Sequence, residues 1–318
     1  MSPEEKPFSP EMIPEPWRQA ELAPPWTAPK PPRRLLHLGL LLATVVTTVI
    51  AGALQQGVNP LETPALLYTG IPFSFTLLLI LGAHEMGHYL VSRRHGLDVT
   101  LPYFLPGPPI IYIPFVGWIP MIIGTFGAFI RIRSPIRDKR TLLDVGCSGP
   151  LTGVLVAIPV ILLGLKLSTV TVIGGGEETI TLGEPLLFKL LSWLALGPMT
   201  PEENIILHPV AFAGWIGLLV TALNLIPVGQ LDGGHVAYAL FPEYQRYISL
   251  GGIGLLVICG VIFWQGWLLW AVLLVFLGWR HPPPYEFWVP LDRRRRVLGI
   301  VTIVVFGLTF SPAPFILG

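Results

Sequence analysis

The stretch of this sequence best suited to chemistry is His84-Glu85-Met86-Gly87-His88. Residues four apart on a helix project from one face, so His84 and His88 can direct two imidazole nitrogens toward a common point. That spacing suits one Zn²⁺, with Glu85 beside it as the base that takes a proton from water at the metal. The alternative is a chance match on a helix turned toward polar neighbours, which composition allows at roughly the one-per-cent level.

A catalytic zinc centre usually takes three protein ligands and keeps one position open. The best third candidate is Asp232, the only acidic residue in the stretch 224–235. Pro227 and the pair Gly233-Gly234 interrupt the helix around it, so the carboxylate can turn inward. The alternative is that Asp232 caps the helix that starts near Gly233.

Two further polar residues accompany Asp232 in the same stretch. Asn224 could hydrogen-bond a substrate backbone or satisfy a neighbouring carbonyl, and we favour the first. His235 could support the metal ligands from behind or simply lie on a helix face.

The composition indicates a membrane protein. Of the 318 residues, 52% are hydrophobic and 12% are charged, and the mean hydropathy is +0.67. Soluble domains carry about 25% charged residues. The basic run 293–296 is interpreted as a membrane-flanking anchor, and no nucleic-acid partner is expected. Cys147 and Cys259 lie in apolar segments and are predicted to be small buried residues, not a disulfide or a zinc site.

We therefore predict an all-α polytopic membrane protein with about six to seven transmembrane helices, each of roughly 20 residues. The predicted spans are 35–54, 66–91, 145–167, 205–226, two short helices within 249–279 that meet near Gln265-Gly266, and 297–310. A short interfacial helix is predicted at 185–196. The HExxH motif lies in the second span, where ionisable groups without a function would be costly.

Residues 101–130 are apolar but contain six prolines, which forbid a regular helix. Non-helical backbone at membrane depth must be covered by protein, so we predict a re-entrant element. Its end, 124–133, alternates in polarity and favours a short strand or hairpin. The predicted organisation is a Pro-rich tail at 1–33, a membrane core at 34–240 with this element at about 101–133, and C-terminal transmembrane helices at 241–318.

Charge distribution predicts the orientation in the membrane. Arginines cluster near the N-terminal tail, at 93–94, at 131–140 and at 293–296, whereas the stretch 168–204 is acidic. The positive-inside rule then places the N-terminus in the cytoplasm and the acidic stretch outside. This orientation sets His84, His88 and Asp232 near the cytoplasmic ends of their helices, at one depth.

The two motifs together resemble those of the site-2 protease family of intramembrane zinc metalloproteases. They are His84-Glu-Met-Gly-His88 in a transmembrane helix and Asn224-Leu-Ile-Pro with Leu231-Asp-Gly-Gly-His235. The resemblance implies one zinc ion per chain held by His84, His88 and Asp232, Glu85 as catalytic base, and Asn224 as a substrate-binding residue.

The resemblance also implies a membrane-embedded β element whose edge accepts an unwound substrate strand, with Gly124, Phe126 and Gly127 as substrate-binding residues. The stretch 168–204 is too short for a PDZ domain, and the C-terminal part is too short for CBS domains. The chain is most similar to short bacterial, archaeal and plastid-type members.

The expected activity is hydrolysis of single-span or other membrane proteins within the bilayer. We expect a bacterial cytoplasmic (inner) membrane, with the active site toward the cytoplasm. Two alternatives are a divalent-metal transporter or channel and an inactive protease-like scaffold. The small number of polar residues in the other spans argues against the first, and the intact Glu85 argues against the second.

Overall fold

Apolar helices make up most of the structure, a computed structural model that describes residues 34–108, 110–113, 117–120, 123–172, 180–200 and 202–317. Within these residues, the helical segments long and apolar enough to cross a membrane are Arg34–Gln55, Pro64–Arg94, Lys139–Lys166 and Gln245–Ile262. Shorter apolar helices span Leu186–Leu196, Pro209–Leu225 and Gly266–Leu277. The predicted polytopic helical class is confirmed. The predicted tail at 1–33 lies outside the described residues.

The first two predicted spans are present as helices α2 and α3. Helix α2 covers Arg34–Gln55, and α3 covers Ile71–Arg94 after the 3-10 turn η2 at Pro64–Gly70. A proline in the first turn of α3 costs nothing, because backbone N–H groups there have no intrahelical partner. The Thr48 and Ser74 hydroxyls, 2.7 Å apart, connect the two helices by a buried hydrogen bond.

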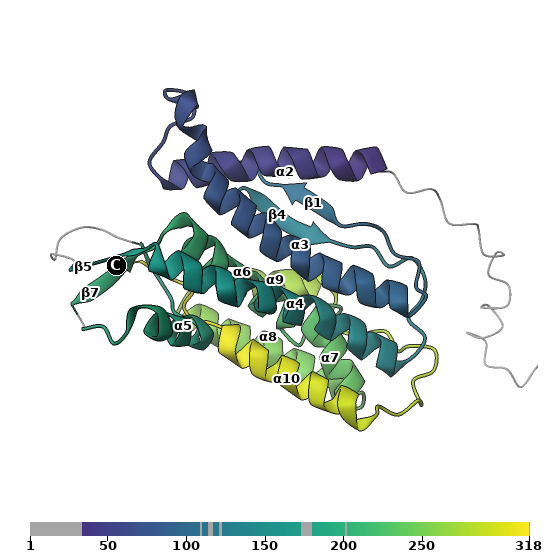
Figure 1. The fold of residues 1–318 in the computed structure, drawn as a ribbon. Coiled ribbons are helices and arrows are strands. Elements are labelled where there is room, and N and C mark those ends of the chain that lie inside the picture. Colours follow the sequence, from purple (N-terminus) through teal and green to yellow (C-terminus); the bar gives the residue numbers. More distant parts are fainter. Residues whose placement is uncertain are drawn as a thin grey trace, which may run out of the picture. The chain divides into compact units, whose positions relative to one another are not determined.

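The described residues of the proline-rich stretch are non-helical, as predicted, but they form more strands than the sequence suggested. Strand β1 (Tyr103–Pro106) pairs antiparallel with β4 (Thr125–Phe129), and β2 (Ile110–Ile113) pairs with β3 (Gly117–Pro120). In Figure 1, β1 runs beside α2 and β4 runs beside α3. The strand predicted within 124–133 is therefore confirmed as β4, next to the helix that carries the HExxH motif.

The third span is helix α4, Lys139–Lys166, which begins earlier than predicted. The Asp138 carboxylate caps it by accepting a hydrogen bond of 2.7 Å from the Thr141 N–H. Beyond α4 come β5 (Thr169–Val172), β6 (Ile180–Leu182) and helix α5 (Leu186–Leu196), which matches the predicted short helix.

The prediction of a fourth span from residue 205 was wrong at its start. Residues Glu203–Ile206 form strand β7, which pairs with β5, and helix α6 covers only Pro209–Leu225. A short run of apolar β-branched residues is compatible with either a strand or a helix. Here the pairing with β5 stabilises the strand.

The C-terminal part contains four helices. They are α7 (Asp232–Leu240), α8 (Gln245–Ile262), α9 (Gly266–Leu277) and α10 (Arg293–Thr309), and β8 (Phe315–Leu317) then pairs with β6. The predicted division of 249–279 into two helices is confirmed. Helix α10 begins earlier than predicted because the Asp292 carboxylate accepts a hydrogen bond of 3.0 Å from the Arg295 N–H, which also lowers the pKa of Asp292.

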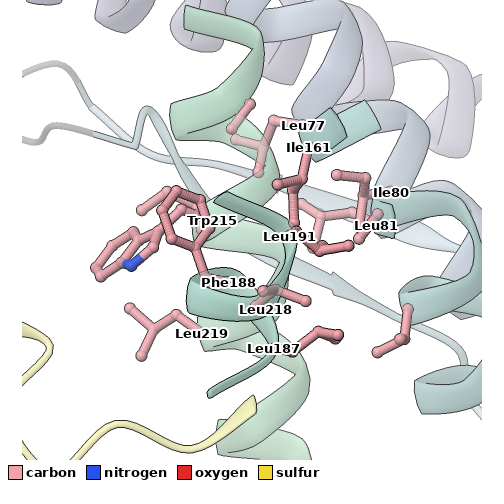
Figure 2. Packing of buried hydrophobic residues seen from close by; sticks show 14 of the residues in the cluster. Leu77, Ile80, Leu81, Ile161, Leu187, Phe188, Leu191, Trp215, Leu218 and Leu219 are labelled. Carbon is pink, nitrogen blue, oxygen red and sulfur yellow. The ribbon is translucent and has the colours of Figure 1, made fainter. Parts of the chain in front are cut away.

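The largest buried cluster joins α3, α4, α5 and α6, as Figure 2 shows. The cluster includes Leu77 and Ile80 of α3, Ile161 of α4, and Trp215 and Leu218 of α6. The Trp215 indole N–H, which would be costly if unpaired, donates to the Gly183 carbonyl at 2.8 Å. This packing fixes α3 relative to α4 and α6.

Glycines allow these helices to approach closely. A Cβ at Gly164 of α4 would overlap the backbone of Ala211 in α6, and a Cβ at Gly217 of α6 would lie 2.8 Å from the Ile80 side chain. Close backbone approach is the usual source of helix association in lipid, where the hydrophobic effect between helices is absent.

A charged cluster joins α4, α10 and the end of α3. The Arg295 guanidinium donates to both Asp144 carboxylate oxygens, with its shortest bond at 2.7 Å, and to Asp292 at 2.6 Å. His95, which follows α3, lies with its Nε2 2.9 Å from Asp144. Bidentate pairing of this kind is strong and directional. The cluster therefore holds three distant segments together.

We predict that Arg295→Gln lowers the free energy of unfolding by about 1–3 kcal/mol, because Asp144 would keep its partly buried charge without this partner. Thermal unfolding of the purified protein in detergent measures the change. The exposed neighbour variant Arg294→Gln is the control and should leave the melting temperature nearly unchanged. Equal melting temperatures for both variants would contradict a stabilising role for the cluster.

Candidate metal centre

Three side chains predicted from the sequence converge on one point. The Nε2 atoms of His84 and His88 lie 3.1 Å apart, and the Asp232 Oδ2 lies 3.3 Å from the first and 3.2 Å from the second. The two histidines come from α3, and Asp232 is 144 residues after His88. Both histidines are buried, with 4% and 7% of their surfaces exposed. The group can hold a metal ion.

These distances suit a tetrahedral centre. With zinc–ligand bonds of about 2.0–2.1 Å, neighbouring ligand atoms lie about 3.4 Å apart, close to the separations observed here. The ring of His88 is also oriented correctly, because its Nδ1 lies 2.9 Å from the Val145 carbonyl oxygen. A carbonyl only accepts, so Nδ1 carries the proton and the Nε2 lone pair faces the cluster. Two imidazoles and one carboxylate are ligands that zinc takes.

Glycines make room for the His88 ring between α3 and α4. A Cβ at Gly149 of α4 would overlap the imidazole of His88. A Cβ at Gly87 would lie 2.8 Å from the Thr152 hydroxyl and would also meet the Ser148 carbonyl. Gly149 thus admits the His88 ring, and Gly87 lets α3 approach the backbone of α4.

Asp232 is the first residue of α7, whose N-cap position is occupied by Leu231, and its carboxylate faces His84 and His88. The alternative of a simple helix cap is therefore wrong. The two glycines after it allow α7 to pack against the end of α6, because a Cβ at Gly233 would overlap the Leu225 carbonyl and one at Gly234 the Gly229 carbonyl. This packing brings the carboxylate back to α3.

The cluster lines a cavity of about 240 Å³. Glu85, 7% exposed, lies in its wall, and the Asn224 side-chain amide Nδ2 is 3.4 Å from the His84 Nε2. Other lining residues are Ala128, Phe129, Ile130, Ile132, Val145, Gln230, Leu231 and His235. The arrangement thus combines a metal-binding group, a carboxylate and a side-chain amide in one space.

The predicted β-element residues lie outside the lining of this cavity. A Cβ at Gly124, whose φ is +71°, would overlap the Thr47 carbonyl of α2, so this glycine serves close packing. Phe126 is 59% exposed, and Gly127 with φ +100° has open space around it. Substrate contacts of these three residues stay a prediction.

Sequence reasoning missed the lining residues further along the same strand and in the loop before α7. Ala128 and Phe129 end β4, Ile130 follows it, and all three line the cavity. Gln230 directly precedes Leu231-Asp232. The signals available for finding them were the position of 128–130 inside the predicted strand stretch 124–133 and the position of Gln230 inside the second motif.

Residues 72–263 match the model of peptidase family M50. This chain belongs to peptidase family M50. The match covers both motifs and more than half of the chain, and it confirms the resemblance to site-2 proteases seen in the sequence. Membership of this family of zinc metalloproteases implies zinc, which His84, His88 and Asp232 fit by distance and by donor type.

Plant proteins named as zinc metalloproteases are similar to this M50 chain. The Arabidopsis thaliana protein named probable zinc metalloprotease EGY2, chloroplastic, is 32% identical over 253 residues, which cover 79% of this chain and 43% of the relative. EGY1 of the same species is 31% identical over 210 residues, covering 61% and 36%. EGY3 of Oryza sativa subsp. japonica is 27% identical over 272 residues, covering 76% and 42%.

The chain spans less than half of the length of these relatives. Their names place these relatives in chloroplasts, so they do not support the expected bacterial inner membrane. The apolar helices do support the coarser expectation of an integral membrane protein that crosses the bilayer several times.

We predict that Gly149→Ala weakens zinc binding by about 10- to 100-fold, because the new methyl group displaces the His88 ring from its hydrogen bond and from the cluster. Zinc per chain after dialysis against graded chelator measures the loss. Gly254→Ala in α8, where a Cβ meets nothing within 4 Å, is the matched control. Wild-type zinc affinity in Gly149→Ala would contradict the geometry described for His88.

Proposed function

We propose that this chain is an intramembrane zinc metalloprotease that hydrolyses peptide bonds in or near the transmembrane segments of other membrane proteins. The single observation that carries the proposal is the meeting of the His84, His88 and Asp232 ligand atoms within 3.1–3.3 Å of one another, in a cavity that also contains Glu85. Family membership supports the same reaction class.

In this proposal, His84, His88 and Asp232 hold the zinc ion. Zinc bound there would make water more acidic and polarise the carbonyl of the scissile peptide bond. The buried position of the cavity keeps its dielectric constant low, which strengthens both effects. Asn224 donates its side-chain N–H to a substrate carbonyl, a role that its place beside His84 supports.

Glu85 acts as general base and then as general acid. Its carboxylate takes one proton from the attacking water, and the remaining hydroxide adds to the carbonyl carbon. The C–N bond then breaks, and Glu85 passes the proton to the nitrogen of the leaving amine. The products are a new carboxyl terminus and a new amine, so one water is consumed for each bond cut.

The substrate reaches this cavity as an extended segment along β4. A helical substrate has its carbonyls in hydrogen bonds and must unwind before attack, and unwound backbone in lipid needs new partners. Among the described strands β4 pairs only with β1. Its other edge can accept a strand, with Ala128, Phe129 and Ile130 beside the cut position and Gly124, Phe126 and Gly127 farther along.

We also propose the orientation and division of the chain that the charges favour. The N-terminal tail, the metal centre and the arginine-rich end of α10 face the cytoplasmic side, or its equivalent in an organelle. Residues 34–240 act as the protease core, and residues 241–318 support it. The substrates are single-span or other membrane proteins.

Replacing Glu85 with Gln tests the catalytic role. The amide cannot accept a proton, so cleavage should fall by at least about 100-fold while zinc content stays at one per chain. Purified full-length protein is incubated with a panel of single-span membrane proteins, and mass spectrometry reads the cut positions. Cleavage by the wild type should also stop after chelation and return with zinc. Proteolysis retained in Glu85→Gln would refute the role.

Thiol labelling tests the orientation. Cys147 and Cys259 are buried and should react little. The test uses spheroplasts that express the protein and a thiol reagent that cannot cross the membrane. We predict that the reagent labels Thr200→Cys, before β7, in intact spheroplasts. It should label Arg294→Cys, at the start of α10, only after the membrane is permeabilised. The reverse pattern would overturn the proposed orientation.

A further inference from the structure

Two histidines outside the metal-binding group form a chain that leads into the cavity. His235 of α7 lines the cavity, and its Nδ1 lies 2.7 Å from the Nε2 of His281, in the segment between α9 and α10. The Nδ1 of His281 in turn lies 2.6 Å from the Pro282 carbonyl oxygen. The His281 ring stacks on Tyr238, with ring centres 4.8 Å apart.

These contacts determine which nitrogens carry protons. The Pro282 carbonyl only accepts, so His281 Nδ1 is the protonated nitrogen. In the neutral ring, His281 Nε2 is then an acceptor, and His235 Nδ1 must donate to it. The remaining nitrogen of His235, Nε2, is left without a proton and has no hydrogen-bond partner among the described residues. Burial lowers the pKa of His281, which keeps its ring neutral near pH 7.

His235 is not itself one of the grouped metal ligands, which are His84, His88 and Asp232. Its ring is on the cavity side of α7, one turn after Asp232, because residues three apart share a helix face. An unprotonated nitrogen in this wall can accept a hydrogen bond from water or, once a substrate is bound, from a peptide N–H group.

We propose that His281 is a positioning residue that holds His235 in the tautomer whose Nε2 accepts the N–H of the peptide nitrogen that leaves during hydrolysis. The proposal rests on the proteolytic function proposed above. It extends that function by assigning a site for the leaving group. The two sequence motifs did not predict this role for His235 or His281.

This hydrogen bond strengthens as the reaction proceeds. When Glu85 delivers its proton, the leaving nitrogen gains positive character, and its N–H becomes a better donor. An interaction that is stronger in the transition state than in the bound substrate raises kcat more than it lowers KM. Loss of a hydrogen bond to a charged group corresponds to about a 10- to 100-fold loss in kcat.

The test compares matched variants of the full-length protein. His281→Phe keeps a ring against Tyr238 but removes the acceptor, whereas His281→Gln keeps an acceptor oxygen near the position of Nε2. His235→Asn keeps an amide at the position of Nδ1 but loses the acceptor at the position of Nε2, whereas His235→Gln keeps an acceptor at the position of Nε2. Pro283→Ala, at an exposed position of the same segment, is the control. The probe is a transmembrane peptide with a fluorophore and a quencher on either side of the mapped cut.

We expect His281→Phe and His235→Asn to lower kcat by about 10- to 100-fold with KM within about twofold, and the Gln variants to recover most of the rate. Zinc content and melting temperature should match the wild type. Wild-type kcat in His281→Phe, or an equal loss in Phe and Gln variants together with lost zinc, would overturn the proposal. If the wild type cuts no probe at all, the proteolytic function fails instead, and the two failures are thereby distinguished.

A spectroscopic measurement tests the positioning without any activity. The ¹⁵N chemical shifts of labelled histidine separate a protonated from an unprotonated ring nitrogen, and His235→Asn assigns the signal. We expect His235 to be protonated at Nδ1 in the wild type and in His281→Gln, and to shift toward the Nε2–H tautomer in His281→Phe. An Nε2–H form of His235 in the wild type would overturn the proposal.

Discussion

The structure depends on the placement of one imidazole between two helices. The His88 ring fits between α3 and α4 because residue 149 has no side chain, and its Nδ1 binds the Val145 carbonyl. This single contact fixes the ring, its tautomer and the distance between the two helices. A polar group without a hydrogen-bond partner is energetically costly inside a membrane. The His88 ring therefore needs both the Val145 carbonyl as its partner and Gly149 to make room for it.

The rest of the site is assembled on that frame by backbone packing. The glycines after Asp232 let α7 rest on the end of α6, and the core around Trp215 holds α6 against α3. The hydrophobic effect does not drive helices together in lipid. Close contacts at glycines and hydrogen-bonded polar groups therefore position these helices. The charged cluster of Asp144, Arg295 and Asp292 ties α10 to the same end of α4, because Asp144 directly precedes Val145.

Much of the fold could be predicted because the signals are local. Long apolar runs and their prolines located most spans and the non-helical stretch, and the Gln265-Gly266 turn separated α8 from α9. The predicted helix starts were less accurate. Capping by Asp138 and Asp292 moved α4 and α10 to earlier starts, and pairing with β5 turned residues 203–206 into a strand. Hydropathy averaged over a window of sequence does not record a helix cap or a strand partner, so it could not predict these boundaries.

The sequence by itself determined the chemistry: two histidines four residues apart on a helix, a glutamate beside them, and one carboxylate between helix breakers. Residue type and helical spacing are properties of a short segment, so they can be recognised without knowledge of the tertiary structure. Only the tertiary structure decided that the carboxylate meets the histidines within 3.3 Å and that Leu231, not Asp232, is the N-cap residue of α7. It also decided that Ala128 to Ile130 line the cavity and that His281 reaches His235. These contacts join segments far apart in the chain, and their geometry comes from how helices pack.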